Sequence, residues 1–344
     1  MSRRPFIILF LIGFALFSMV VTTTIGVADI SSIDVFKIII SKIPGLTFLI
    51  EQDWPSTWDT IILQMRMPRV ALGFIVGASL SIAGAAFQGL LRNPLADPYT
   101  IGVSSGAALG ATIAMFLQTS LNMTFQIGIP FFAFLGAIIA LAFVYNLARV
   151  GNTVPVVTLL LAGVVISSFL SAVISLLMLL AGENIRGIYF WLVGGLSLRN
   201  WSHVLMILPY IIAGSAAIMF WSRDLNVILL GEEEAANLGI EVEKVKKIML
   251  VAASLITGAV VSVSGMIGFV GLIIPHTVRM IVGPDHRILI PTSALFGGIY
   301  LIWIDSLART VMAPVEVPVG IITAFLGAPF FIYLLRSKRK DFRF

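Results

Sequence analysis

The sequence predicts an all-α integral membrane protein with about ten transmembrane helices and an inverted internal repeat. Hydrophobic residues make up 59% of the 344 residues and charged residues 11%, whereas a soluble domain carries roughly 25% charged residues. A water-soluble chain could not cover that much apolar surface, which disfavours soluble enzymes, disordered proteins and nucleic-acid-binding proteins. The apolar residues form long unbroken runs, which favour helices over a barrel, and two of these runs share one sequence pattern.

The first apolar run, 6–27, follows two arginines and is expected to be a retained first helix, with a secretory signal peptide as the alternative. The polar stretch 28–61 is predicted to be an extracytoplasmic loop that contains a short amphipathic piece. Further spans of about 20 residues are expected at 70–90, 98–118, 127–148, 154–181, 203–221, 248–266, 268–283, 288–307 and 317–335. The span 268–283 is short and rich in glycine and proline, so we expect it to be broken or partly re-entrant.

The basic residues predict the orientation of these spans. An even number of spans puts both termini on one side, and most of the 22 lysines and arginines fall in the loops and tails of that side. Because cytoplasmic loops carry an excess of Lys and Arg, both termini and the polar segment 222–247 are expected in the cytoplasm. The chain 1–344 is then one multi-pass transmembrane domain in the lipid of the cytoplasmic membrane.

The repeated pattern places small residues at a fixed spacing. Each copy holds a glycine, a serine and a second glycine, followed by an aromatic-Gly segment and a proline. These residues are Gly77, Ser81 and Gly84 in the first copy and Gly258, Ser262 and Gly265 in the second. The copies lie five expected spans apart, so they face opposite ways, as in the inverted repeats of transporters. Small residues at this spacing let helices pack closely, and lining a transport pathway is the alternative role.

The chain lacks the residues expected of a membrane enzyme or an ion-coupled carrier. It contains no cysteine, no HExxH pair, no carboxylate dyad and no Ser/His/Asp set at a suitable spacing. The expected spans hold almost no ionisable residue at mid-length, where proton and sodium carriers place an acid. No lysine follows a glycine, so the chain has no Walker A loop. We therefore expect no enzyme activity, cofactor or metal in this chain, and active transport would need energy from another chain.

The segment 231–240 is a candidate contact for such a chain. Glu232, Glu233 and Glu234 begin a short helix-favouring piece, and Gly239 is a natural helix stop. The segment could be a solvated loop or a coupling helix that inserts into a groove of a cytoplasmic motor. The run Glu234, Ala235, Ala236 and Gly239 resembles the EAA-type coupling loop of ATP-binding-cassette (ABC) importer permeases, with one residue fewer before the glycine.

Longer motifs make the resemblance more specific. They are RMPR at 66–69, GLLRNPLADP at 89–98, GVSSGA at 102–107, LLLAG at 159–163, FWLVGG at 190–195, GFVGLIIPH at 268–276, GPDHR at 283–287 and GAPF at 327–330. Together, and in this order, they resemble the FecCD family of iron-chelate and cobalamin permeases over about residues 66–335. The resemblance implies a second permease subunit, identical or related, two ABC ATPases that bind ATP and Mg, and an extracytoplasmic binding protein.

The resemblance also implies roles for residues of this sequence. Arg66, Arg69 and Arg309 match arginines that meet acidic residues of the binding protein, with snorkelling at the membrane interface as the alternative. Reversing the charge of Arg66 or Arg69 is expected to weaken docking without lowering the amount of protein. Val156 and Val157 match the cytoplasmic gate region, although family members with small polar residues there differ from this apolar pair.

The expected cargo is a metal chelate. The family resemblance implies a ferric siderophore as the commonest choice, with cobalamin or haem as alternatives. The path is expected along the helices near 70–90, 154–181 and 248–266, as an apolar corridor rather than a specific binding site. An ion-coupled secondary transporter, a membrane enzyme and a passive channel remain as alternatives from other classes, and none of them would need an ATPase partner.

Overall fold

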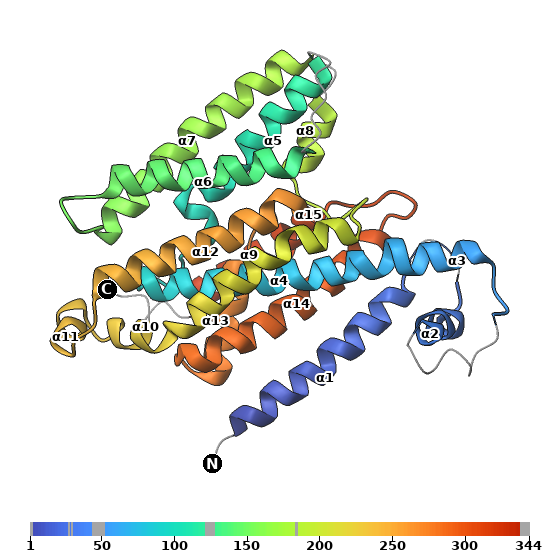
Figure 1. Cartoon of the computed structure of the whole chain (residues 1–344), viewed down its shortest axis with the longest axis horizontal. Coiled ribbons are helices and arrows are strands. Elements are labelled where there is room, and N and C mark those ends of the chain that lie inside the picture. The colour runs from blue at the N-terminus through green and yellow to red at the C-terminus, as the bar shows by residue number, and fades with distance from the viewer. Residues whose placement is uncertain are drawn as a thin grey trace.

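The structure is a computed structural model that describes residues 3–26, 28, 30–42, 52–120, 128–182 and 185–337. These residues are almost entirely helical (Figure 1), with one isolated β-bridge between Val150 and Thr153. The first helices are α1 (Arg3–Thr24), α2 (Ser32–Ser41), α3 (Ser56–Thr60), the π-helix η2 (Ile61–Arg66), α4 (Met67–Leu90), the 3-10 helix η3 (Pro98–Ile101), α5 (Val103–Ser120), α6 (Gly128–Ala148) and α7 (Val156–Ala181). They are followed by α8 (Ile185–Leu192), α9 (Trp201–Phe220), α10 (Ser222–Ile228), α11 (Glu232–Asn237), α12 (Val242–Ser264), α13 (Val270–Val282), α14 (His286–Thr310) and α15 (Val319–Ser337).

The helices confirm the predicted membrane fold. Seven helices within the described residues are long and apolar enough to cross a membrane, and α5, α13 and α15 are shorter apolar helices. Together they match the ten expected spans. The loop 28–61 contains α2, the expected amphipathic piece, whereas residues 43–51 of that loop and the basic tail 338–344 lie outside the described residues.

The span expected at 98–118 begins later, at Val103. Asp97 caps η3 by accepting a hydrogen bond from the Tyr99 backbone N–H at 3.0 Å, and Gly102 follows with a φ of 83°. Because a residue in the left-handed region interrupts helical backbone, α5 can begin only after this glycine.

The expected break near 268–283 is present as an unwound segment between α12 and α13. Gly265 and Phe269 adopt φ values of 67° and 69°. The Tyr99 hydroxyl accepts a hydrogen bond from the Ile267 N–H at 2.7 Å and donates one to the Ile267 carbonyl at 2.8 Å. Backbone groups among apolar helices have no water to bind, so the tyrosine replaces the helical partners that this segment lacks.

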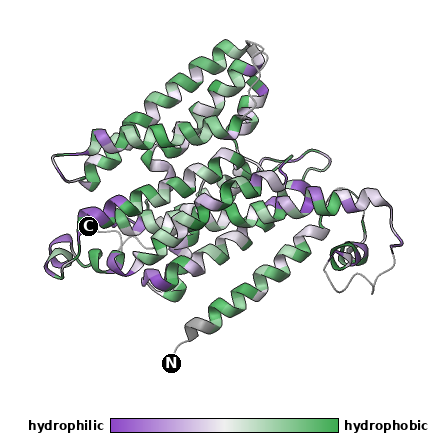
Figure 2. Ribbon diagram, viewed as in Figure 1, coloured by the Kyte–Doolittle hydropathy of each residue, from purple (hydrophilic) through white to green (hydrophobic). Residues whose placement is uncertain are grey.

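The helices divide into a buried centre and an exposed periphery. The membrane-spanning parts of α4 and α12 are mostly buried, whereas α1 and α7 expose most of their apolar side chains. Figure 1 shows α5, α6 and α7 on one side of this centre and α1 on the other. Figure 2 shows hydrophilic residues gathered toward the two ends of the bundle, with apolar helices between them. Such apolar faces between two polar ends are those of a protein embedded in lipid.

The two copies of the repeat run in opposite directions. α3 and α11 lie at opposite ends of the bundle (Figure 1), which we call the α3 end and the α11 end. α4 follows α3 and runs toward the α11 end, whereas α12 follows α11 and runs toward the α3 end. α4 packs along α14, and α12 packs along α6. In the first half α6 follows α4, and in the second half α14 follows α12 in the same position. The first helix of each half therefore packs against the corresponding later helix of the other half, as an inverted repeat predicts.

The small residues of the repeat lie at close helix contacts. A Cβ atom on Gly77 would lie 2.2 Å from the Gly297 carbonyl oxygen, and one on Gly84 would lie 1.8 Å from that of Gly271. Gly258 meets the Ala137 side chain at 3.0 Å, a looser contact, and Gly265 is buried against the Trp191 carbonyl. The two serines, Ser81 and Ser262, donate to carbonyls of their own helices. This geometry favours the packing role over the pathway role.

Candidate functional site

Two of the three arginines expected to dock a partner are held inside the protein at the α3 end. Arg66, the last residue of η2, donates hydrogen bonds to the carbonyls of Thr24 at 3.0 Å and Ala28 at 2.7 Å, and is buried. Arg309, near the end of α14, is also buried and donates to the carbonyl of Ile25 at 2.8 Å. Arginine has five N–H donors in a rigid fork, so these two side chains clamp the backbone that follows α1.

The third arginine, Arg69, joins two carboxylates. Its guanidinium lies 2.9 Å from Asp305 of α14 and 2.9 Å from Glu316 in the loop between α14 and α15. Asp305 also pairs with Arg309 at 3.2 Å, and Glu316 accepts a hydrogen bond from the Ser197 hydroxyl. Arg69 thus ties α4 to α14 and, through Glu316, to the loop before α9.

The electrostatics of Glu316 reflect these contacts. Burial alone would raise the pKa of this carboxyl, but the hydrogen bonds from Arg69 and Ser197 outweigh burial and lower the pKa below its usual value. Its side chain is still 35% exposed. Glu316 is therefore an ionised group that solvent, or a docking partner, can reach.

The three arginines are therefore brought together, as one site would require, but each has internal partners. Reversing the charge of Arg66 would place a carboxylate against the backbone carbonyls that its guanidinium now satisfies, which costs free energy. The sequence predicted that such a variant would be present in a normal amount. From the structure we instead expect a smaller amount of folded protein.

The α3 end also holds two cavities and a cation that the sequence did not single out. One cavity, of about 400 Å³, lies beside the loops that flank α8 and α15, and the other, of about 620 Å³, reaches η2 and the end of α1. Both are lined by Arg69, Leu198, Arg199 and Glu316. No described residue offers an acceptor to the buried Nε of Arg199 or a carboxylate within 4.0 Å, and burial lowers the pKa of this guanidinium. A partly buried cation without a counter-charge marks this rim as a place for an incoming acid.

Asp305, Glu316 and Arg199 are the residues that sequence reasoning missed here. Asp305 carried a weak signal, because it is an ionisable residue inside an apolar run. The other two lie in polar loops where nothing in the local sequence indicates a long-range contact.

The candidate coupling segment forms α11 at the other end of the molecule. This helix covers Glu232–Asn237, and Glu232, Glu233 and Glu234 lie in its first turn as the sequence indicated. It ends as predicted at Gly239, which has a φ of 85°; the Gly239 N–H donates to the Ala236 carbonyl and the Ile240 N–H to the Ala235 carbonyl. These two bonds are those of a Schellman motif, which satisfies the last carbonyls of a helix.

The faces of α11 differ. Ala235 is fully buried against the body of the protein, whereas Glu233, Glu234, Ala236 and the following Leu238 are exposed. The exposed face thus combines acidic side chains with the apolar Ala236 and Leu238.

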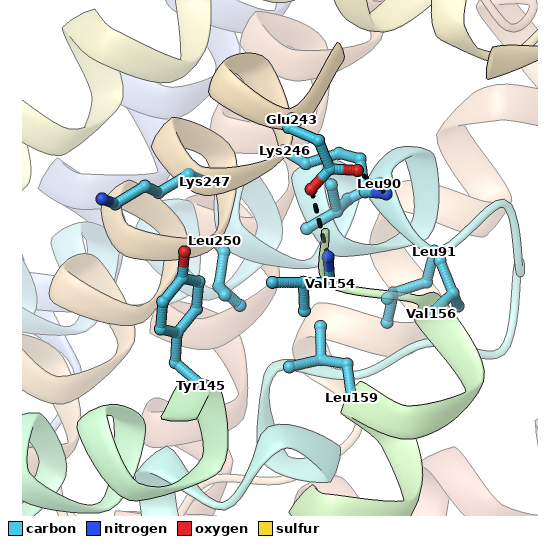
Figure 3. A pocket seen from close by; sticks show the side chains of 10 residues that line it. All are labelled: Leu90, Leu91, Tyr145, Val154, Val156, Leu159, Glu243, Lys246, Lys247 and Leu250. Carbon is cyan, nitrogen blue, oxygen red and sulfur yellow. Dashed lines mark hydrogen bonds and ion pairs between the residues drawn. The ribbon is translucent and has the colours of Figure 1, made fainter. Parts of the chain in front are cut away.

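The predicted gate residues lie at the same end, at the start of α7. Val156 is half-buried and lines a small pocket with Val154, Leu159 and Leu250 (Figure 3), whereas Val157 is exposed. The beginning of α7 is therefore close to α12, the helix that follows α11.

Comparisons with known proteins agree over nearly the whole chain. The FecCD transport family matches residues 11–337. The cobalamin import permease BtuC of Halobacterium salinarum is 48% identical over 284 residues, which are 83% of this chain and 75% of that protein. The Fe(3+)-citrate import permease YfmD of Bacillus subtilis is 36% identical over 98% of this chain and 96% of its own. A solved metal-chelate type ABC transporter in an inward-facing conformation is similar with a TM-score of 0.83 at 31% identity, covering 97% of this chain and 99% of that chain.

Proposed function

Because the chain belongs to the FecCD transport family, we propose that it is the membrane-spanning permease subunit of an ABC importer that moves a metal chelate across the cytoplasmic membrane. The observation that carries this proposal is the family match over residues 11–337. The chain is a transport subunit rather than an enzyme, and ATP and Mg bind to two partner ATPases. A second permease subunit, identical or related, completes the membrane part.

The ATPase contact is α11, with both termini on the same cytoplasmic side. The residues that form it are Glu232, Glu233, Glu234, Ala235, Ala236 and Gly239. Ala235 anchors α11 to the permease, and the exposed glutamates with Leu238 enter the ATPase groove. The buried anchor supports this role, because a helix must be held firmly to transmit a movement.

The extracytoplasmic binding protein docks at the α3 end. Arg69 and Arg199 line both cavities there, and the partly exposed Glu316 can give up its place on Arg69 to a carboxylate of the partner. A planar guanidinium suits such a carboxylate. Arg66 and Arg309 do not contact the partner directly but support the docking surface by holding the backbone after α1 in place.

The path runs along α7, with the cytoplasmic gate at Val156 and Val157. Of the three helices expected near the path, α4 and α12 are mostly buried, whereas α7 exposes an apolar face that a second permease subunit can oppose. An apolar corridor binds a large chelate weakly and lets it pass.

Two cargoes compete. The sequence resemblance favours a ferric siderophore, whereas the 48% identity to a cobalamin import permease favours cobalamin over the ferric citrate relative at 36%. We therefore propose a metal chelate as the cargo class. Ferric siderophores are the first candidate and cobalamin is the second, and the two should be compared directly.

The proposal is tested by reconstitution. The permease is purified with the ATPase and binding protein encoded beside it, placed in vesicles, and supplied with labelled ferric siderophore or cobalamin. We expect uptake that requires ATP and the binding protein and that persists when the membrane potential is collapsed. Uptake by the permease alone, or uptake that disappears with the potential, would support a secondary carrier and reject the ABC assignment.

A further inference from the structure

A buried lysine lies at the start of α12, between α11 and the body of the protein. The Lys246 ammonium is 2.7 Å from Glu243, one turn earlier on α12, and 3.3 Å from Glu232, the first residue of α11. The lysine side chain is 9% exposed, whereas the two carboxylates are 37% and 40% exposed. Lys246 therefore joins α11 to α12 from the inside, while its partners reach solvent.

The same glutamate also holds the chain ahead of α7. The second carboxylate oxygen of Glu243 accepts a hydrogen bond from the Val154 backbone N–H at 3.1 Å, as Figure 3 shows. Val154 is buried, and the next residue, Pro155, has no N–H. Val154 thus supplies the last backbone donor before α7, and Glu243 binds it.

Apolar side chains close the space around these groups. Leu90 and Leu91 from the end of α4 and Tyr145 from α6 line the same pocket as Val154 and Lys246 (Figure 3), and the free volume there is only about 20 Å³. Dense packing transmits a displacement rather than absorbing it. A movement of α12 at this point therefore reaches the chain at Val154.

We propose that Lys246 and Glu243 are positioning residues that carry the movement of α11 to the cytoplasmic end of α7. The connection runs from Glu232 through Lys246 and Glu243 to the Val154 N–H. A buried ammonium that lost both carboxylates would be strongly destabilised, so the elements that supply them move together with it. This proposal rests on the proposed function, because it assumes that an ATPase moves α11.

The chain contains a matched control for the proposed pair. Lys244, in the first turn of α12, pairs at 2.9 Å with Glu241, the residue just before that helix and also three residues away, but their side chains are 53% and 72% exposed. Among the described residues, this pair forms no hydrogen bond or ion pair with α11 or with the loop before α7, and Lys244 lies 5.9 Å from the centre of the Trp221 ring. The Lys244→Met variant therefore reports the effect of losing a charge at this end without breaking the connection.

The experiment uses the absence of cysteine from the chain. A single Val157→Cys substitution places a thiol at the exposed start of α7, and the rate of its reaction with a maleimide is measured in the complete transporter with and without ATP. We expect Lys246→Met to reduce the ATP-dependent change in this rate, and the cargo moved per ATP hydrolysed, by about fivefold or more. Lys246→Arg and Lys244→Met should each keep both quantities close to the parent.

The outcomes separate the two proposals. If the Lys246→Met transporter retains the parent response and transport ratio within about twofold, the positioning proposal is overturned while the importer stands. If Lys246→Met does not assemble, Glu243→Gln, whose amide oxygen can still accept from Val154, is expected to reduce the response in the same direction, and an unchanged response again rejects the proposal. If the transporter with the unsubstituted permease shows no ATP-driven uptake, the proposed function fails and this proposal with it.

Discussion

The buried charges at the α3 end and at the α11 end are arranged in opposite ways. At the α3 end, Arg66 and Arg309 are enclosed and satisfied by backbone carbonyls, and Asp305 is enclosed with them. At the α11 end the Lys246 side chain is enclosed, whereas its two carboxylate partners stay partly in solvent. The difference shows that the charges of Arg66, Arg309 and Asp305 are enclosed on every side as part of the fold, whereas the buried Lys246 is joined to carboxylates that solvent can still reach.

The largest effect that this contrast predicts is on stability. Arg69→Met removes the partner of Glu316 and one partner of the buried Asp305, so we expect a loss of about 3 kcal/mol or more in the free energy of unfolding. Lys246→Met leaves carboxylates that water can reach, so its loss should be clearly smaller. Thermal unfolding of both variants in detergent measures the difference. Equal losses would show that the two clusters do not differ in this way.

A second, intermediate effect concerns partner binding. Leu238 beside α11 and Leu198 at the α3 end are both exposed leucines. We expect Leu238→Ser to weaken association with the ATPase about tenfold, as the loss of roughly 1.4 kcal/mol of contact would, without lowering the melting temperature. Leu198→Ser is the matched control and should leave ATPase binding unchanged. Co-purification with the ATPase measures both, and equal weakening by the two variants would contradict the assignment of α11.

The smallest effect concerns the pH dependence of Glu316. Because its pKa is lower in the folded protein than its ordinary value of 4.5, its ionised form stabilises the fold above that pH, and this contribution is lost as the pH falls below it. Glu316→Gln should therefore lower stability by less than about 1 kcal/mol at pH 7, since the pair is partly exposed. Melting temperatures of parent and variant are compared at pH 7 and in acid. A difference that grows in acid would reverse the expected sign.

The elements that the sequence predicted well are those with strong local signals. Ten apolar segments, the break after α12 and the stop at Gly239 all appear where expected, because hydropathy and glycine act over a few residues. The start of α5 was wrong by five residues, because the Asp97 cap and Gly102 form a separate turn inside an otherwise apolar run. The three arginines were grouped only by resemblance, and the structure adds that Arg69 and Arg309 share Asp305.

The sequence by itself determined that this protein is a helical bundle in lipid, built from two opposed copies, with an acidic helix at one end. Apolar runs leave no other means of satisfying the backbone in a membrane. The tertiary structure alone decided which charges are enclosed and what they bind. Arg69 pairs with Glu316, which lies far away in the sequence, and Glu243 of α12 accepts a hydrogen bond from the Val154 N–H before α7. Such contacts depend on how helices far apart in sequence cross, and no local pattern of residues encodes that crossing.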